Sequence, residues 1–317
     1  MSCVWMRRAL LAVASASALV LAACGSGTIE SQLRPSRIVS FGDSFADVGQ
    51  TGSRYTVNDG GIDIWTQQVA LGFGLDLTPA AAGGTSFATG NARVVRKPDA
   101  TGNGATPTVA EQIDAFLARG PIGANDLLIV NAGTADVIAE VARLTAGTQS
   151  RDQMLAELRQ AGRDLAAQVR RLVDAGAPHV AVVGTYDLGR SPWARGAGQG
   201  QLLSDASNRF NEQLLVSMVD LGQHVLYIDA PLVFNIMVAE PGAYSMANST
   251  DPVCTSVDPG PGIGIGAGQV NSARCTTSTL RASVDYGQFV FADLVYPTPA
   301  AHRHFGDYAY SRIRQRW

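Results

Sequence analysis

Charged residues are scarce in this sequence of 317 residues, and lysine is almost absent. Only 16% of the residues are charged and 46% are apolar, which excludes a disordered or fibrous chain and provides for one large hydrophobic core. The net charge is −3, Lys97 is the single lysine, and the arginines are scattered. No nucleic-acid partner is therefore indicated, because such a partner requires a basic stripe or patch. The sequence also lacks internal repeats, so a single domain is the expectation.

The first residues lack the length of a membrane span but carry the parts of an export signal. The segment MSCVWMRR ends in two arginines, and the apolar run that follows is uncharged, short and rich in alanine. That run ends in LAACG, which is similar to a bacterial lipoprotein box. We therefore expect a signal peptide at residues 1–23, lipidation of Cys24, and a polar tether over residues 24–36 that holds the protein at the bacterial cell envelope, in the outer membrane. An ordinary signal peptide that contains a cysteine is the alternative interpretation.

Loss of the signal and lipidation of Cys24 leave two cysteines for the folded domain, Cys254 and Cys275. In an oxidising compartment such a pair favours a disulfide. The two cysteines flank the segment DPGPGIGIGAGQ, which can bury little of itself, and closing this loop would stabilise the fold by roughly 3 kcal/mol in the chain-entropy model. Two free thiols are the alternative.

Apolar runs alternate with helical patterns from residue 37 to the end of the chain. Four runs are typical of buried strands: 37–41, 127–130, 180–183 and 225–228. Five amphipathic segments predict helices: 64–71, 109–118, 154–173, 202–221 and 300–313. The alternation predicts one α/β domain over residues 37–317, a three-layer α/β/α sandwich with a central, mostly parallel sheet. Two segments without a pattern, 93–108 and 246–280, are expected to be surface excursions.

A serine follows the first predicted strand in the segment FGDSFADVG. In a parallel sheet, chemistry lies beyond the carboxyl ends of the strands, and a serine at a strand-to-helix turn presents its hydroxyl there together with backbone N–H groups. Gly-Asp-Ser alone would fit a helix cap equally well. Further segments carry more information: YTVNDGGIDIWTQQVALGFGL, GGTSFATGNAR, TYDLGRSP, ASNRFNEQL and EPGAYSMANSTDPVC. With these blocks the chain resembles the GDSL (SGNH) hydrolase family, in its bacterial phospholipase/lecithinase/hemolysin-like and esterase branch, over most of residues 37–317.

The resemblance implies a flavodoxin-like SGNH fold and a serine esterase or lipase that acts on acyl esters of small molecules or lipids. It places the nucleophile at Ser44 and an oxyanion N–H at Gly90. The Asn91 amide, which stands where the family usually has a second glycine, is a further candidate donor. It implies no cofactor and no metal, and no histidine pair here has the spacing of metal ligands.

Two positions depart from the family pattern. The third block should read Gly-x-Asn-Asp, with the asparagine amide as an oxyanion donor, but Ala135 stands at the asparagine position. A literal Gly-x-Asn-Asp that contains Asn125 precedes a strand of six residues, so it lies roughly 20 Å away at the wrong end of the sheet. The last block should read Asp-x-x-His, but Asp293 is followed by Tyr296. A phenol with its ordinary pKa near 10 is about 0.1% ionised at pH 7 and is a poor general base.

Another histidine is needed if the site has an imidazole base. His302 lies in the predicted closing helix, where a side chain can point back toward the site, but a structural role in that helix is the alternative. The sequence therefore leaves two hypotheses open. The chain is an exported, lipid-anchored esterase of reduced activity, or it is a catalytically impaired relative that binds an acyl, glycan or envelope partner.

Overall fold

The computed structural model describes residues 31–61 and 64–317. The chain divides into two units, 1–32 and 33–317, and the second contains every helix and strand that follows. Cys24 and the predicted signal peptide lie outside the described residues. No helix within the described residues is long and apolar enough to cross a membrane.

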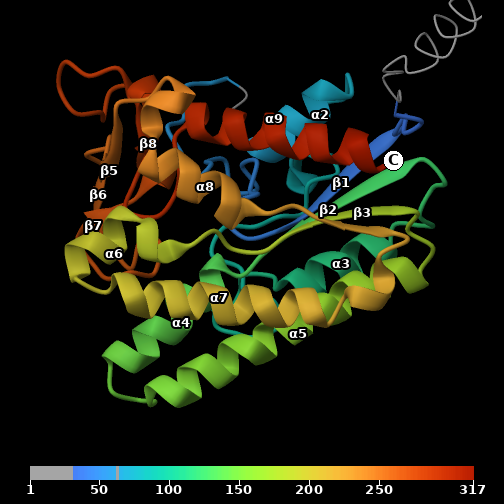
Figure 1. Cartoon of the computed structure of the whole chain (residues 1–317), viewed down its shortest axis with the longest axis horizontal. Coiled ribbons are helices and arrows are strands. Elements are labelled where there is room, and N and C mark those ends of the chain that lie inside the picture. The colour runs from blue at the N-terminus through green and yellow to red at the C-terminus, as the bar shows by residue number, and fades with distance from the viewer. Residues whose placement is uncertain (1–30, 62–63) are drawn as a thin grey trace, which may run out of the picture. The chain divides into compact units, whose positions relative to one another are not determined.

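Four parallel strands form the central sheet in the order β1-β2-β3-β4 (Figure 1). They are β1 (Arg37–Gly42), β2 (Asp126–Asn131), β3 (His179–Val183) and β4 (Val225–Tyr227). The register aligns Gly42 of β1 with Asn131 of β2, and Asn131 with Val183 of β3, so the carboxyl ends of three strands meet at one edge. All four strands were predicted from their apolar runs.

Alternate residues of each strand enter two separate hydrophobic cores. Ile38 and Ile129 point into one core, and their neighbours Val39 and Val130 point into the other. Such alternation is the period of two of a β-strand, and burial on both faces explains why the strands read as continuous apolar runs. The sheet is therefore covered on both sides, as predicted.

Helices form the outer two layers (Figure 1). One face of the sheet carries α2 (Trp65–Gly72), α8 (Ala230–Ala239) and α9 (Pro299–Arg316). The other carries α3 (Val109–Leu117), α5 (Arg151–Asp174) and α7 (Gly200–Val216). The three-layer α/β/α prediction is thus confirmed.

Helix starts follow local capping chemistry. Thr108 and Ser150 each accept a hydrogen bond from the backbone N–H three residues on, and a Glu or Gln there returns the bond, so both α3 and α5 begin with a capping box. Thr298 caps α9, with proline in the first helical position. Three helices were not predicted: α4 (Thr134–Thr145), α6 (Pro192–Ala197) and α8. The sequence of α8, APLVFNIMVA, has almost no polar face, so its helical period is weak.

The segment 246–280, expected to be a surface excursion, contains strands of its own. Strand β5 (Asn248–Pro252) pairs in parallel with β8 (Phe289–Phe291), and β6 (Val257–Asp258) pairs antiparallel with β7 (Gln269–Val270). A third small core, which includes Cys254 and Cys275, lies beneath it. The expectation was therefore incomplete, because pairing with a strand some 40 residues away leaves no local pattern.

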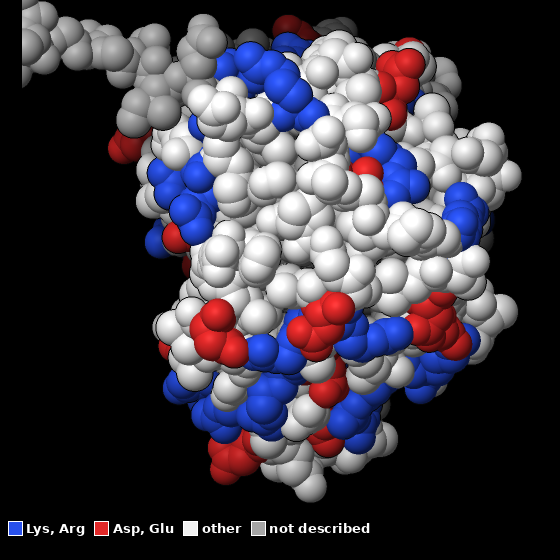
Figure 2. Space-filling model, turned by 90° about the vertical axis from the view of Figure 1, so that its right-hand side faces the viewer, with Lys and Arg blue, Asp and Glu red and all other residues white. Residues whose placement is uncertain are grey.

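Basic and acidic side chains are intermixed on the face of the molecule shown in Figure 2, around a broad uncharged area. Charged side chains at the protein surface also form ion pairs with one another, among them Arg171 with Asp114 and Arg170 with Asp220. This face has no continuous basic stripe.

Candidate active site

Ser44 lies in the tight turn that follows β1, at the carboxyl edge of the sheet. The turn needs glycine at position 42, because a Cβ atom there would lie 1.9 Å from the carbonyl oxygen of Asn131 on the neighbouring strand. The Ser44 hydroxyl oxygen accepts a hydrogen bond of 2.8 Å from the backbone N–H of Asn91. Ser44 itself is fully buried. The predicted nucleophile therefore meets a backbone donor at the expected edge, beneath a cover of other side chains.

Asp43 connects this turn to the start of α4. Its carboxylate accepts hydrogen bonds from the N–H groups of Phe45 (3.0 Å) and Ala135 (3.3 Å). Burial raises the pKa of Asp43 to about 7, against the opposing effect of these hydrogen bonds. The backbone of Ala135 is therefore hydrogen-bonded directly to the turn of Ser44, but the methyl side chain of Ala135 cannot donate a hydrogen bond to an oxyanion. Asn125 lies at the opposite, amino end of β2, where its carbonyl accepts the N–H of Ser36.

The backbone donor that reaches Ser44 belongs to Asn91 and not to Gly90, where the oxyanion N–H was expected. The N–H of Gly90 donates to the Asp47 carboxylate at 2.8 Å and so is directed away from Ser44. The N–H that reaches Ser44 belongs to Asn91, and the Asn91 side-chain amide donates to the Tyr55 hydroxyl at 3.0 Å. Asn91 has φ of 63°, a left-handed conformation that explains why glycine is usual at this position and why asparagine is tolerated.

Gly90 also allows a close contact with Tyr55. A Cβ atom at position 90 would lie 2.2 Å from the Tyr55 hydroxyl oxygen. Asp47, which receives the Gly90 N–H, is buried, and burial raises its pKa to about 6. Asp47 and Tyr55 were not singled out from the sequence, although Asp47 stands within the GDSFADVG block.

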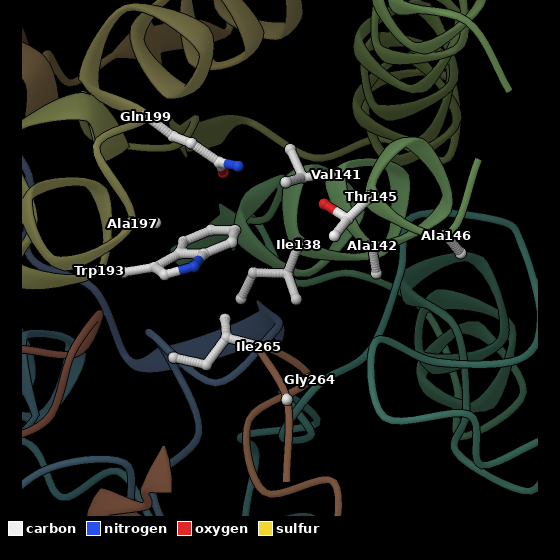
Figure 3. Close-up of a pocket in the computed structure, with 11 residues that line it drawn as sticks. Ile138, Val141, Ala142, Thr145, Ala146, Trp193, Ala197, Gln199, Gly264 and Ile265 are labelled. Carbon is white, nitrogen blue, oxygen red and sulfur yellow. The ribbon is translucent and has the colours of Figure 1, made fainter. Parts of the chain in front are cut away.

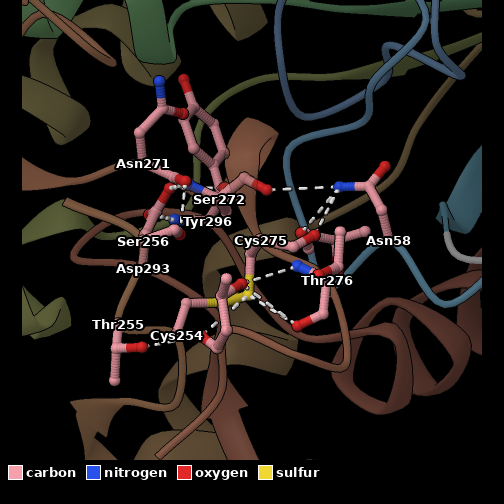
Figure 4. Close-up of a disulfide and its surroundings, with 12 residues drawn as sticks. Asn58, Cys254, Thr255, Ser256, Asn271, Ser272, Cys275, Thr276, Asp293 and Tyr296 are labelled. Carbon is pink, nitrogen blue, oxygen red and sulfur yellow. Dashed lines mark hydrogen bonds between the residues drawn. A yellow bond between two sulfur atoms is a disulfide. The ribbon is translucent and has the colours of Figure 1, made fainter. Parts of the chain in front are cut away.

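Asp293 is saturated with hydrogen bonds from its own turn and from a distant loop (Figure 4). One carboxylate oxygen accepts from the N–H groups of Val295 (2.8 Å) and Tyr296 (2.6 Å). The other accepts from both the N–H (3.0 Å) and the hydroxyl of Ser272. Burial raises the pKa of Asp293, and these bonds oppose that effect. None of the four bonds involves the Tyr296 phenol.

Tyr296 is fully buried, and its hydroxyl has no hydrogen-bond partner among the described residues. Its ring packs edge-on against that of Tyr55, with centroids 5.2 Å apart. Burial, reinforced by the nearby charge of Asp43, raises the pKa of Tyr296 well above 10, although the neighbouring Ser44 hydroxyl acts in the opposite direction. The phenol therefore stays protonated near neutral pH and does not serve as a general base.

His302 does not fill the role of the missing base in this arrangement. It is buried in the first turn of α9, where its Nδ1 accepts the Trp65 N–H at 3.4 Å and its ring lies 5.1 Å from that of Phe45. Burial lowers the pKa of His302 to about 3. Within residues 33–61 and 64–317 no hydrogen bond joins it to Ser44, so its contacts are those of a core residue.

The predicted disulfide between Cys254 and Cys275 is present, which confirms that prediction. It closes the loop that contains Ser272, and the Asn58 side chain donates to the carbonyls of Ser272 and Cys275 (Figure 4). The N–H of Cys275 donates to the carbonyl of Ser272, and Ser272 donates to Asp293, so two hydrogen bonds connect the bridge to Asp293.

A protein-family model described as GDSL-like Lipase/Acylhydrolase matches residues 38–309, nearly the whole folded unit. The chain belongs to this family. Membership supports an ester-hydrolase function and agrees with a serine at the carboxyl edge of a parallel sheet. It does not by itself assign a substrate.

Three curated relatives are similar to this chain. An "Uncharacterized protein in trpE-trpG intergenic region" from Pseudomonas putida is 28% identical over 302 residues, which cover 89% of this chain and 49% of the relative. "Esterase EstA" of Pseudomonas aeruginosa and that of Pseudomonas putida are each 24% identical over 131 residues, covering 41% of this chain and 19% of the esterase. The chain spans about half the length of the first relative and about a fifth of the two esterases.

An ion-pair network next to the GDSL-family blocks was not predicted. Arg93, at the end of the second block, donates to Asp136 (3.2 Å) and to Glu140 on the next turn of α4. All three side chains are buried, and Asp136 also accepts the N–H of Val94 at 3.0 Å. Asp136 is the last residue of the third block, so its signal was present in the sequence. The network holds the start of α4 beside Asn91.

The described residues contain no group of three His, Cys, Asp or Glu side chains that could hold a metal ion. Around Ser44 the structure places the Asn91 N–H and the buried carboxylate of Asp43, with the hydroxyl of Tyr296 nearby.

Proposed function

We propose that this chain is a serine esterase of the bacterial cell envelope that hydrolyses acyl esters slowly, through an acyl-enzyme on Ser44. The observation that carries the proposal is the 2.8 Å hydrogen bond from the Asn91 N–H to the Ser44 hydroxyl oxygen at the carboxyl edge of the sheet. Family membership and the two relatives named as esterases support the reaction class.

The first step is attack of the Ser44 oxygen on the ester carbonyl carbon, which gives a tetrahedral oxyanion. The Asn91 N–H, which donates to the Ser44 hydroxyl oxygen in the structure, is the backbone donor available to that oxyanion. Collapse of the intermediate releases the alcohol and leaves an acyl group on Ser44. Water then hydrolyses the acyl-enzyme to the carboxylic acid. Neither step requires a metal or a cofactor.

The rate is limited by proton transfer and by the oxyanion contacts. Tyr296 stays protonated, so water has to take the Ser44 proton, and a missing general base lowers a rate by about 10² to 10⁴. Ala135 supplies no side-chain donor, and loss of one such donor lowers a rate by about 10² to 10³. The two losses do not simply multiply. Substrate entry also requires the cover over the buried Ser44 to open.

Export and lipid anchoring are part of the proposal and rest on the first residues of the sequence. The segment LAACG supports lipidation of Cys24, and the polar residues after it suit a tether. The substrates available to such a protein are small-molecule or lipid esters of the envelope.

Labelling with a fluorophosphonate tests the nucleophile, because this reagent forms a covalent bond with an activated serine. The wild-type protein should be labelled, and Ser44→Ala should abolish the label. Ser40→Ala is the matched control, since Ser40, within β1, is as fully buried as Ser44 but its hydroxyl has no partner among the described residues. Labelling that survives in Ser44→Ala would assign the reaction to another residue.

A second function, binding without turnover, is favoured by the buried and unpartnered phenol of Tyr296 at the base position. In that case the protein is an impaired relative that binds an acyl, glycan or envelope partner. No labelling of the wild type, together with saturable binding of an acyl ligand, would favour this function over the esterase.

A further inference from the structure

An uncharged cavity of about 490 Å³ lies between α4, α6 and residues 264–266, and Ser44 is not among its lining residues (Figure 3). Ile138 and Ala142 of α4 form one wall, and Trp193 of α6 faces them across the cavity. Gly264 and Ile265 form the floor, and both belong to residues 259–268, here called the glycine-rich loop. The volume is that of a small-ligand pocket, and its lining is mostly aliphatic and aromatic. This chemistry suits an aliphatic chain and offers little to a sugar or a nucleotide.

The two elements that form the walls of the cavity are also hydrogen-bonded to residues next to Ser44 and Tyr296. Ala135, Ile138 and Ala142 lie at i, i+3 and i+7 on one face of α4, and a helical turn is about 5.4 Å long. The N–H of Ala135 bonds to Asp43, next to Ser44. On the opposite wall, the backbone N–H of Trp193 donates to the carbonyl of Leu294 at 2.9 Å, within the turn of Asp293 and Tyr296. The inner ends of both walls therefore adjoin the Ser44 region.

The glycine-rich loop lies between the cavity and the segment that contacts Ser44. Gly264 has φ of +89°, and a Cβ atom there would lie 2.4 Å from the carbonyl oxygen of Ala100 and 2.9 Å from the Ile138 side chain. Ala100 in turn donates its N–H to the Asn91 carbonyl at 3.1 Å. A second hollow of about 510 Å³ borders the same loop, so the loop has open space on two sides and Ile263 as its buried anchor.

We propose that the cavity between α4, α6 and the glycine-rich loop binds the acyl chain of the substrate, with the carboxyl end directed toward Ser44. The identity of the ligand as a substrate rests on the proposed esterase function, whereas binding of the chain does not require turnover. This placement requires a path from the cavity to Ser44, which a displacement of the glycine-rich loop from Ala100 would open. Each methylene group buried in the cavity strengthens binding by up to about fourfold.

Calorimetric titration of the full chain with octanoate, decanoate and dodecanoate, each below its micellar concentration, tests this proposal. Affinity should rise with chain length. Ala142→Trp, which fills the cavity from an exposed position on α4, should weaken dodecanoate binding at least tenfold. Ala175→Trp is the matched control, because this exposed alanine follows α5 at the opposite edge of the sheet, and it should bind as the wild type does.

Equal affinity for the three acids, or equal binding by Ala142→Trp and wild type, would overturn the acyl-chain assignment. Ser44→Ala separates this proposal from the esterase. Suppose that Ser44→Ala and wild type bind dodecanoate equally, and that the wild type shows neither fluorophosphonate labelling of Ser44 nor esterase activity. The cavity assignment then stands and the esterase fails. If labelling of Ser44 is found but dodecanoate does not bind, the cavity assignment fails and the esterase stands.

Discussion

Ser272 donates both its backbone N–H and its hydroxyl to the same carboxylate oxygen of Asp293. The loop closed by the Cys254–Cys275 disulfide is thereby bonded to the residue that, in the resemblance to GDSL hydrolases, orients the catalytic base. Since Asp293 accepts four hydrogen bonds and donates none, the arrangement suits the ionised carboxylate. The disulfide loop is therefore part of the support of the site.

The first prediction concerns this pair. Ser272→Ala removes a hydrogen bond to a buried carboxylate and should lower the free energy of unfolding by about 2 kcal/mol. Ser256→Ala is the matched control in the same loop, because its hydroxyl donates to a neutral carbonyl, that of Asn271, at 2.9 Å. Its loss should be smaller, about 1 kcal/mol. Denaturant titration of both variants measures the difference, and equal losses would contradict a special role for the Asp293 contact.

The second prediction concerns the disulfide. Alkylation of the exported protein without reductant, followed by mass measurement, should find neither Cys254 nor Cys275 free. Replacing both by serine should lower the free energy of unfolding by roughly 3 kcal/mol, since the bridge spans 21 residues. Two modified cysteines in the non-reduced protein would contradict the bridge.

The third prediction concerns His302 and pH. Its pKa is about 3 in the folded protein and 6.5 in the unfolded chain, so only the unfolded chain gains a proton as the pH falls through 6.5. Stability is consequently lost on acidification over the window from pH 6.5 to pH 3. His302→Phe removes this loss, so between pH 7.5 and pH 5 wild type should lose about 2 kcal/mol relative to the variant. Denaturant titrations at the two pH values measure it, and parallel losses would show that His302 titrates normally.

The sequence predicted the sheet well because both faces of each strand are buried. Ile38 and Val39 point to opposite cores and are both apolar, so the strand appears as an unbroken apolar run whatever the pairing. The β5–β8 pair was not predicted, since Asn248–Pro252 is polar and its partner lies far along the chain. Local sequence cannot reveal such a partner.

The site was predicted only in part, because some of its contacts are local in the sequence and others are not. The turn of Ser44 is local, and its glycine and serine are visible in one block. The donors around it are not local: Asn91 reaches Ser44 across 47 residues, and Ser272 reaches Asp293 across 21 residues. Gly90 illustrates the limit, because the sequence does not show whether its N–H is directed to Ser44 or to Asp47, and the structure shows that it donates to Asp47.

The fourth prediction concerns Cys24, which lies outside the described residues. If Cys24 is lipidated, the wild-type protein should fractionate with membranes, and Cys24→Ala should move it to soluble or uncleaved forms. Cys3→Ala is the matched control, because Cys3 lies in the predicted signal peptide and should have no effect on fractionation. An unchanged distribution of Cys24→Ala would reject the lipoprotein interpretation.

The last prediction concerns Tyr296, which stands at the base position with Asp293 three residues before it. Tyr296→His should raise hydrolysis of short p-nitrophenyl esters at least about tenfold, a small part of what a well-placed base contributes. The gain should be present where the imidazole is neutral and fall as the pH is lowered and the imidazole gains a proton. Tyr296→Phe is the matched control, since it removes the phenol without supplying a base and should not reproduce the gain.

Ala135→Asn and Ser44→Ala, each combined with Tyr296→His, distinguish the contribution of the base from those of the oxyanion donor and the nucleophile. Ala135→Asn places an amide beside the turn of Ser44, so adding it to Tyr296→His should raise the rate further. Both gains should vanish with Ser44→Ala, because they act through the same hydroxyl. The Asp293 oxygens already accept four hydrogen bonds, so a new imidazole has to share one of them, which limits the gain. No gain in either variant, with the circular dichroism spectrum unchanged, would mean that the pocket has diverged beyond these two positions, and it would favour binding over catalysis.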